Sequence, residues 1–183
     1  MNQINFQHET ERLFLRVINS MAAPEVLRFY NDNREVFERY EAQRVANFYT
    51  LEYMQRVLDF EYNLCVKMSS IRFWVFPKME PTHIIGTVCL RNITHYPYHS
   101  CEIGYKFDEG FWHQGYATEA IQKTILIAFH DMEIHRITAH IMPENIASLR
   151  LVERLGFERE GIARQSALIR GTWEDHVVYS ILA

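Results

Sequence analysis

A strand that contains a glycine, followed at once by a glycine-bearing helix start, limits what this chain can fold into more than any other segment. The stretch "CEIGYKF" (Cys101–Phe107) alternates apolar and polar residues, which predicts a strand with one apolar face. "GFWHQGYATEA" follows and leads into apolar residues at helical spacing that continue to about Met132. The sequence therefore predicts a strand, a short loop and a helix in direct succession.

The start of this helix has the composition of an anion-binding site. The first N–H groups of a helix have no partner within the helix and lie at the positive end of its dipole, so they attract phosphate. A phosphate reaches them where side chains stay clear, which favours Gly115 and Ala117. The stretch matches neither a P-loop nor the G-x-G-x-x-G fingerprint. It predicts a backbone cradle for a diphosphate, and a strand-to-helix turn that merely uses glycine is the alternative.

Gly104 favours the ligand-binding interpretation. A glycine inside a strand weakens the strand and often marks a bulge or the close approach of a ligand. With the cradle a few residues later, we expect one extended ligand, with one end along the strand and the other on the helix.

The rest of the chain indicates an α+β fold with a sheet of mixed direction and a single domain over residues 1–183. Strand patterns flank a segment rich in helix formers, Ala22–Met68, for which two or three helices are expected. A second helix pattern, "NIASLRLVERLG", ends at Gly156. The predicted strands are "ERLFLRVI", the hairpin "IRFWVF" and "IIGTVCLRNI", "RITAHI", and C-terminal strands ending in "HVVYSILA".

Composition excludes several classes of function. A formal charge of −4 gives no basic footprint for nucleic acid. The first 17 residues contain acidic side chains and no long apolar core, so no signal peptide is expected, and no run reaches the roughly 18 apolar residues of a membrane helix. Cys65, Cys89 and Cys101 are scattered without metal-type spacing. We expect buried thiols, no metal and a cytoplasmic protein.

Four ordered motifs together resemble one family over nearly the whole chain. "WHQGYA" resembles the diphosphate loop Q/R-x-x-G-x-G/A of the GCN5-related N-acetyltransferases (GNAT), although Trp112 stands where that pattern has Gln or Arg. "PENIASLRLVERLGF" is similar to the helix that follows in the family. "ETERLFLRV" and "GTWEDHVVYSIL" resemble the branch of the Rim-type ribosomal-protein N-terminal acetyltransferases.

The resemblance implies a GNAT fold: one twisted, mixed, mostly antiparallel sheet of six to seven strands flanked by helices. It also implies a splayed central parallel pair, formed by Cys101–Phe107 and Arg136–Ile141. Acetyl-CoA is the implied co-substrate. Its pantetheine would pair with the backbone of Tyr105, Lys106 and Phe107, and its diphosphate would bind the amides of a second set, namely His113, Gln114, Gly115, Tyr116 and Ala117.

A donor to the departing thiolate is the first catalytic group that the chemistry needs. Many family members use a tyrosine at the position that is Val152 here. Ser148 matches a serine proposed for this role in the Rim-like branch, and a polar residue in the first turn of a helix is the alternative. Asn145 fits both an N-cap and a side-chain contact with the cofactor.

The proton of the amine needs an acceptor, and two residues compete for this role. His140 lies on the strand that faces the gap, and a histidine suits a base near neutral pH. Glu102 shares a strand face with Gly104. A carboxylate that some Rim-type enzymes use corresponds here to Ala167, so that route is absent.

The resulting hypothesis is an N-acetyltransferase that moves acetyl from acetyl-CoA to a primary amine by direct attack. The N-terminal α-amine of a protein, of the ribosomal-protein type, is the first choice, because its ordinary pKa of about 7.7–8 leaves much of it neutral. A small amine (a polyamine, amino sugar or amino-acid-like metabolite) and a non-catalytic CoA-binding regulatory module are the alternatives. An open groove would favour a protein terminus and a closed acidic pocket a polyamine. Monomer and homodimer both stay open.

Overall fold

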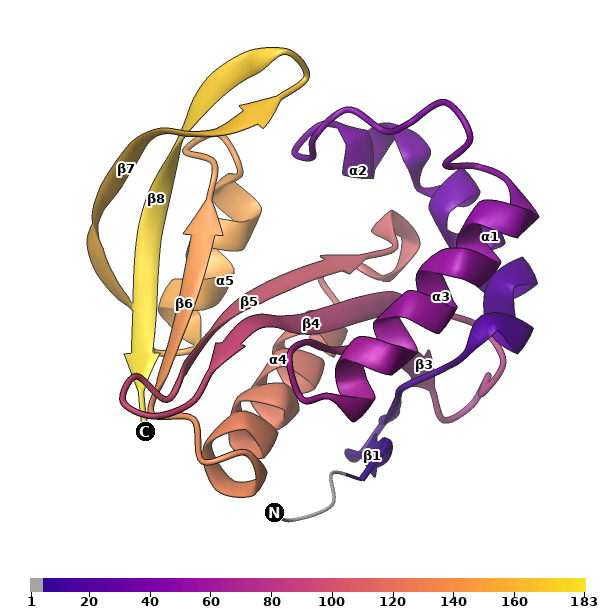
Figure 1. Ribbon diagram of the computed structural model, residues 1–183, viewed down its shortest axis with the longest axis horizontal. Helices are drawn as coiled ribbons and strands as arrows, with labels where there is room; N and C mark the ends of the chain where they lie inside the picture. The colour runs from indigo at the N-terminus through magenta and orange to yellow at the C-terminus, as the bar shows by residue number, and fades with distance from the viewer. Residues whose placement is uncertain (1–4) are drawn as a thin grey trace.

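The computed structural model describes residues 5–183, so residues 1–4 of the predicted domain lie outside the described range. Its eight strands form one sheet in the order β1-β2-β3-β4-β5-β6-β8-β7 (Figure 1). The prediction of six to seven strands was too low, partly because a three-residue edge strand, β1, carries no clear pattern. The strands are β1 (Gln7–Glu9), β2 (Leu13–Arg16), β3 (Ile71–Pro77), β4 (Gly86–Thr94), β5 (Ser100–Phe107), β6 (Arg136–Ile141), β7 (Glu158–Ile169) and β8 (Thr172–Leu182).

Helices fill the three long connections between strands. The segment between β2 and β3 forms three helices, α1, α2 and α3, which confirms the expected number. The helix after β5, α4, continues through a π-helical turn toward Met132, as its pattern predicted. Gly156 ends the helix after β6 with a φ of +88°. The bounds are α1 (Ala23–Asp32), α2 (Arg34–Glu38), α3 (Leu51–Val66), α4 (Tyr116–Leu126) and α5 (Ile146–Arg154).

Strand β3 is buried on both faces because two groups of helices cover this part of the sheet, whereas β7 is largely exposed. One core joins the face that carries Phe73 to Ile121 of α4 and Val152 of α5. The second core places Trp74, the next residue of β3, among aromatic side chains of α1 and the apolar face of α3. Alternate residues of β3 therefore enter different cores, and Figure 1 shows α1 and α3 grouped on one side of strands β2–β4.

The pair β5–β6 is the parallel pair of an otherwise antiparallel sheet, and it separates halfway along. The two strands are paired at Ser100–Arg136, Cys101–Ile137 and Glu102–Thr138, with no pairing beyond. β6 stays paired with β8 over its full length, so it is the β5 side that opens. Figure 1 shows the two strands diverging toward their C-terminal ends. The predicted splayed pair is confirmed.

The three cysteines are free and buried, as expected from their scattered positions. Burial raises the pKa of Cys65 to about 11 and that of Cys101 to about 12, so both thiols stay protonated near neutral pH. Within residues 5–183, no helix has the length and apolar character needed to cross a membrane.

Candidate active site

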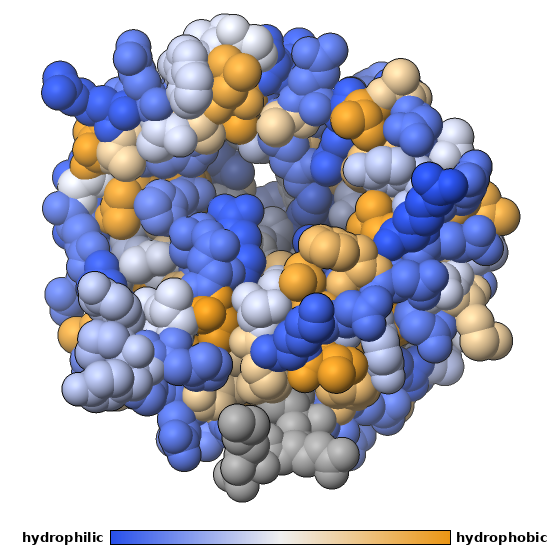
Figure 2. Space-filling view, viewed as in Figure 1, coloured by the Kyte–Doolittle hydropathy of each residue, from blue (hydrophilic) through white to orange (hydrophobic). Residues whose placement is uncertain are grey.

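The separation of β5 from β6 opens into a cleft of about 890 Å³. Its walls come from several parts of the fold: α2 and the residues after it, strands β3–β6, the loop before α4 with the first turn of that helix, α5 along its length, and β8. Figure 2 shows the surface hollowed between the two segments labelled α2 and β7/β8 in Figure 1. The cleft therefore runs through the sheet at the point where the parallel pair parts.

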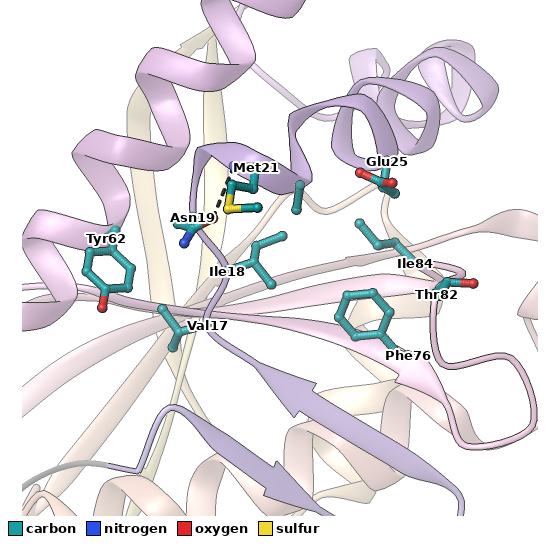
Figure 3. A pocket seen from close by; sticks show the side chains of 10 residues that line it. Val17, Ile18, Asn19, Met21, Glu25, Tyr62, Phe76, Thr82 and Ile84 are labelled. Carbon is teal, nitrogen blue, oxygen red and sulfur yellow. Dashed lines mark hydrogen bonds between the residues drawn. The ribbon is translucent and has the colours of Figure 1, made fainter.

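A second hollow of about 430 Å³ lies elsewhere, beside the end of β2 (Figure 3). Apolar side chains such as Ile18, Phe76 and Ile84 dominate its lining, with Glu25 at its edge. None of the site residues predicted from the sequence lines it, whereas most of them line the larger cleft.

The loop before α4 holds its N–H groups open through backbone geometry. Gly115 is the N-cap of α4, has a φ of +83° and makes no side-chain cap. His113 also adopts a positive φ, of 60°. Trp112 donates from its indole nitrogen to the carbonyl oxygen of Phe107 at 2.9 Å, which ties the loop to the end of β5. The departure at Trp112 thus has a structural role.

The predicted cofactor residues fall into two groups by position. His113, Gly115 and Ala117 line the cleft, as do Tyr105, Lys106 and Phe107 of β5. Gln114 and Tyr116 are not among the lining residues, and the Gln114 amide donates back to the carbonyl of Gly110 at 3.0 Å. Contact of Gln114 and Tyr116 with a cofactor stays a prediction.

An arginine from the other end of the chain braces this loop, and sequence reasoning missed it. Arg12 donates through Nη1 to the carbonyl of Gln114 at 3.0 Å, and its guanidinium lies 4.5 Å from the ring centroid of Tyr116. Its Nε pairs with Glu119 in the first turn of α4 at 2.7 Å. The motif "ETERLFLRV" was noted, but nothing in the sequence links Arg12 to a helix 107 residues away.

The contacts of Glu119 matter because a carboxylate near the helix start would repel a phosphate. Thr10 donates to it at 2.6 Å and the backbone N–H of Arg12 at 2.9 Å. Burial acts to raise the pKa of Glu119, but these hydrogen bonds and the Arg12 guanidinium outweigh burial and lower it. The negative charge of Glu119 is therefore kept, and Arg12 and Thr10 compensate it at the edge of the cradle.

We expect Arg12→Leu to weaken acetyl-CoA binding about 5-fold, equivalent to about 1 kcal/mol. The loop would lose the hydrogen bond to Gln114, and the Glu119 charge would lose its partner. Calorimetric titration measures the change. Arg28→Leu, at an exposed position of α1, is the matched control, and equal affinities in the two variants would contradict the bracing role.

Gly104 faces open space. A Cβ built on it would meet no atom within 4 Å, and its φ is not in the left-handed region. Gly86 differs, because a Cβ there would lie 2.3 Å from the Phe107 ring. Neither packing nor backbone conformation requires a glycine at 104, which agrees with the close approach of a ligand.

Gly104→Ala should therefore weaken acetyl-CoA binding about 10-fold without destabilising the protein. The added methyl group would enter the cleft, while an alanine in a strand loses less conformational freedom on folding than a glycine, by about 0.5 kcal/mol. Titration and denaturant unfolding of the same variant test both parts. Unchanged affinity would mean that the ligand does not pass along this strand.

The start of α5 is fixed to β5 across the gap. Asn145 Oδ1 accepts from the Ser148 N–H at 3.2 Å, so its N-cap role is confirmed. The Tyr105 hydroxyl donates to the Ser148 carbonyl at 3.3 Å, and burial raises the pKa of Tyr105 to about 12. All three residues line the cleft, whereas Val152 is fully buried in the core. Contact of Asn145 and Ser148 with a cofactor stays a prediction.

The two residues predicted as proton acceptors are placed differently. His140 is exposed on β6 and lines the cleft. Glu102 does not line it, and its carboxylate accepts from Arg91 Nε at 3.1 Å and from Asn92 Nδ2 at 2.8 Å. The structure brings His140 together with Ser148 in one cleft and holds Glu102 apart. It also adds His176 of β8, which sequence reasoning did not consider, to a lining that already includes His113.

Positive side chains outnumber negative ones along the cleft. Lys106 forms an ion pair with Glu41, and its ammonium group lies over the ring of Tyr30. Glu41 also pairs with Arg44. Burial lowers the pKa of Lys106 to about 8. Among the described lining residues Glu41 is the one carboxylate, against five basic side chains: Arg72, Arg91, Lys106, Arg150 and Arg154. The cleft is therefore not an acidic pocket.

Known proteins are similar to this chain in sequence and in fold. The family described as the acetyltransferase (GNAT) domain matches residues 12–158. The chain is 35% identical to the probable N-acetyltransferase YjcK of Bacillus subtilis over 93% of each chain. It is 31% identical to the [ribosomal protein uS5]-alanine N-acetyltransferase of Escherichia coli, covering 94% of this chain and 88% of that one.

A solved structure agrees with these relatives. The ribosomal-protein-S5-alanine acetyltransferase from Vibrio fischeri superposes with a TM-score of 0.91 at 32% identity, covering 97% of each chain. The resemblance first read from four motifs is thereby confirmed, as is the α+β fold with its parallel pair. The chain belongs to the GNAT acetyltransferase family and is an acetyl-CoA-dependent N-acetyltransferase.

Proposed function

We propose that the acceptor is the N-terminal α-amine of a protein and that acetyl passes to it by direct attack. The observation that carries this proposal is the cleft: its 890 Å³ volume opens to the surface between α2 and the β7–β8 hairpin (Figures 1 and 2). A chain terminus can enter such a groove with its following residues still outside. An enclosed site for a small metabolite would not require this opening.

The charge of the cleft supports the same choice over a polyamine. Two or more ammonium groups would have to enter a lining whose one described carboxylate, Glu41, already pairs with Lys106 and Arg44. Its five basic side chains include Arg72 and Arg91, which pair with carboxylates outside the lining, and Arg150 and Arg154 of α5. Like charges at close range disfavour that partner. A peptide terminus brings one amine, which must be neutral to react.

The relatives give independent support. The proteins from Escherichia coli and Vibrio fischeri are named for the acetylation of an alanine of ribosomal protein S5. At 31% and 32% identity over nearly the whole chain, a protein α-amine is the first acceptor class to test here. Buried free thiols fit a cytoplasmic location, where such acceptors occur.

The proposed chemistry assigns roles around the thioester. The amine nitrogen attacks the carbonyl carbon, the C–N bond forms, and the C–S bond breaks with its electron pair going to sulfur. Ser148 is proposed to donate to the departing thiolate, with Asn145 holding the helix start. Of the two proton acceptors predicted from sequence, His140 is the better placed, because Glu102 is held by Arg91 and Asn92.

A panel of acceptors at fixed acetyl-CoA concentration tests the proposal. Short peptides with a free N-terminus, the same peptides with a blocked N-terminus, spermidine and glucosamine would be compared by release of free CoA. We expect release with the free peptides and little with the others. Faster release with spermidine or glucosamine would assign a small amine, and binding of acetyl-CoA without release would assign a regulatory module.

A further inference from the structure

His176 lies on the acceptor face of the cleft although its side chain is almost fully enclosed. It is 8% exposed and still lines the cleft. Val178 is the direct partner of His140 across β6 and β8, and His176 lies two residues before it, so both histidines project from the same face. This face continues across Thr138 of β6 to its partner Glu102 of β5, whose carboxylate is held by Arg91 and Asn92.

An irregularity in β7 is built against this histidine. Pairing between β7 and β8 shifts between Ala163–His176 and Ala167–Glu174, so that three residues of β7 oppose one of β8. Gln165, within the bulge, has a φ of +47°, and its N–H donates to Asp175 Oδ1 at 2.7 Å. Bulges re-aim side chains and are common beside active sites. Here the bulge brings Ser166 Oγ to 3.0 Å from His176 Nδ1.

The contacts of Nδ1 favour one tautomer of the neutral ring. Nδ1 also lies 3.3 Å from the carbonyl oxygen of Glu174, which accepts and never donates. With the hydrogen on Nδ1 the ring donates to Glu174, and Ser166 Oγ accepts as well; with the hydrogen on Nε2 the Glu174 contact is lost and only a Ser166 hydroxyl can pair with Nδ1. We infer that Nδ1 holds the hydrogen. Nε2 is left with a lone pair, and no residue within 5–183 hydrogen-bonds to it. The ring is thus preset as an acceptor.

We propose that His176 is the catalytic base of this enzyme: Nε2 accepts the proton that the amine loses on attacking the thioester. The amine nitrogen forms the C–N bond, the electron pair of the C–S bond goes to sulfur, and the proton on His176 later passes to solvent. His140, exposed on β6, is then not the first acceptor. The inference rests on the proposed transfer to an amine, but not on which amine is used.

Other charged groups face the same space and bear on any pH profile. His140 faces it from β6, Lys106 from β5, and His113 from the loop before α4. The remaining charged lining groups are Glu41 after α2, Arg72 on β3, Arg91 on β4, and Arg150 and Arg154 on α5. Of these, the histidines ordinarily titrate between pH 5 and 8, and Lys106, whose pKa burial lowers to about 8, titrates at the upper edge of that range.

The tautomer can be measured without any acceptor. A long-range ¹H–¹⁵N spectrum of the full chain would show the ring nitrogens of all nine histidines, with His176 assigned by its loss in His176→Gln. We expect the neutral His176 ring to carry its proton on Nδ1. A proton on Nε2 would overturn the proposal whatever the acceptor turns out to be.

The pH dependence of turnover tests the role itself, using whichever amine of the panel releases CoA fastest. We expect His176→Gln to lower kcat at least about 10-fold at pH 7, while KM for acetyl-CoA stays within about 2-fold. In the plot of kcat against pH, the variant should also lack the rising limb that the parent enzyme shows over the pH range in which histidines titrate. His95→Gln, at an exposed position outside the cleft, is the matched control and should keep the limb. His140→Gln tests the competing histidine and should also keep it. Ser166→Ala should keep it with a lower plateau, because it loosens the ring without removing it.

Two outcomes contradict the assignment. If His140→Gln loses the limb and His176→Gln keeps it, the base is His140. If both keep it, solvent takes the proton. Either result leaves the α-amine proposal intact, because the acceptor panel decides that question separately.

Discussion

Gly115→Val is expected to weaken acetyl-CoA binding by at least about 100-fold, equivalent to about 2.7 kcal/mol. A valine side chain would cover the N–H groups at the start of α4, where a diphosphate must approach within hydrogen-bond distance. The φ of +83° is also unfavourable for a β-branched residue, and a Cβ there would lie 3.2 Å from Arg12 Nη2. Calorimetric titration of the purified variant measures the effect.

Gly171→Val separates the two causes. Gly171 has nearly the same backbone conformation, with a φ of +85°, but lies in the turn between β7 and β8. Both variants should lose a similar 1–2 kcal/mol of unfolding free energy through strain. Gly171→Val should still bind acetyl-CoA normally. If both lose binding equally, strain rather than a blocked cradle explains Gly115.

Ser148→Ala is expected to lower kcat about 100-fold while leaving KM for acetyl-CoA within about 2-fold. A donor to the departing thiolate acts in the transition state and contributes little to binding of the ground state. The fold should tolerate the change, because the cap of α5 uses the Ser148 N–H and the Asn145 side chain, not the serine hydroxyl. Steady-state kinetics with the best acceptor gives both constants.

Ser148→Thr keeps a hydroxyl at the same position and is the conservative control, for which partial activity is expected. Equal turnover in Ser148→Ala and the parent enzyme would leave the serine as an ordinary residue of the first helical turn. In that case the neutral Tyr105 hydroxyl, which reaches the Ser148 carbonyl, becomes the next donor to test.

Local patterns in the sequence predicted most of the elements. The alternation of Cys101–Phe107 predicted β5, and the apolar spacing after Gly115 predicted α4, because both depend on neighbours within a few residues. The short strand β1 was missed, since three residues at a sheet edge have too few contacts to leave a pattern.

For the candidate site, the sequence indicated the positions where backbone geometry dominates, but not the contacts where distant side chains meet. Gly104 and Gly115 were identified because glycine has a physical meaning on a strand and at a helix start. Arg12 and Glu119 are 107 residues apart, and the contact of Ser166 with His176 depends on a bulge that no periodicity reveals. The ion pair that holds Glu102 likewise depends on strand pairing, which places Arg91 opposite Glu102.

One peptide that carries both a free N-terminal alanine and an internal lysine decides between the two kinds of amine. After incubation with the enzyme and acetyl-CoA near pH 7.5, tandem mass spectrometry locates the acetyl group. We expect acetylation of the α-amine, which is about one-third neutral there, and none of the lysine, which is neutral in only about one molecule per thousand. Acetyl on the lysine, or an unmodified peptide alongside rapid acetylation of spermidine, would contradict the proposed transfer to an α-amine.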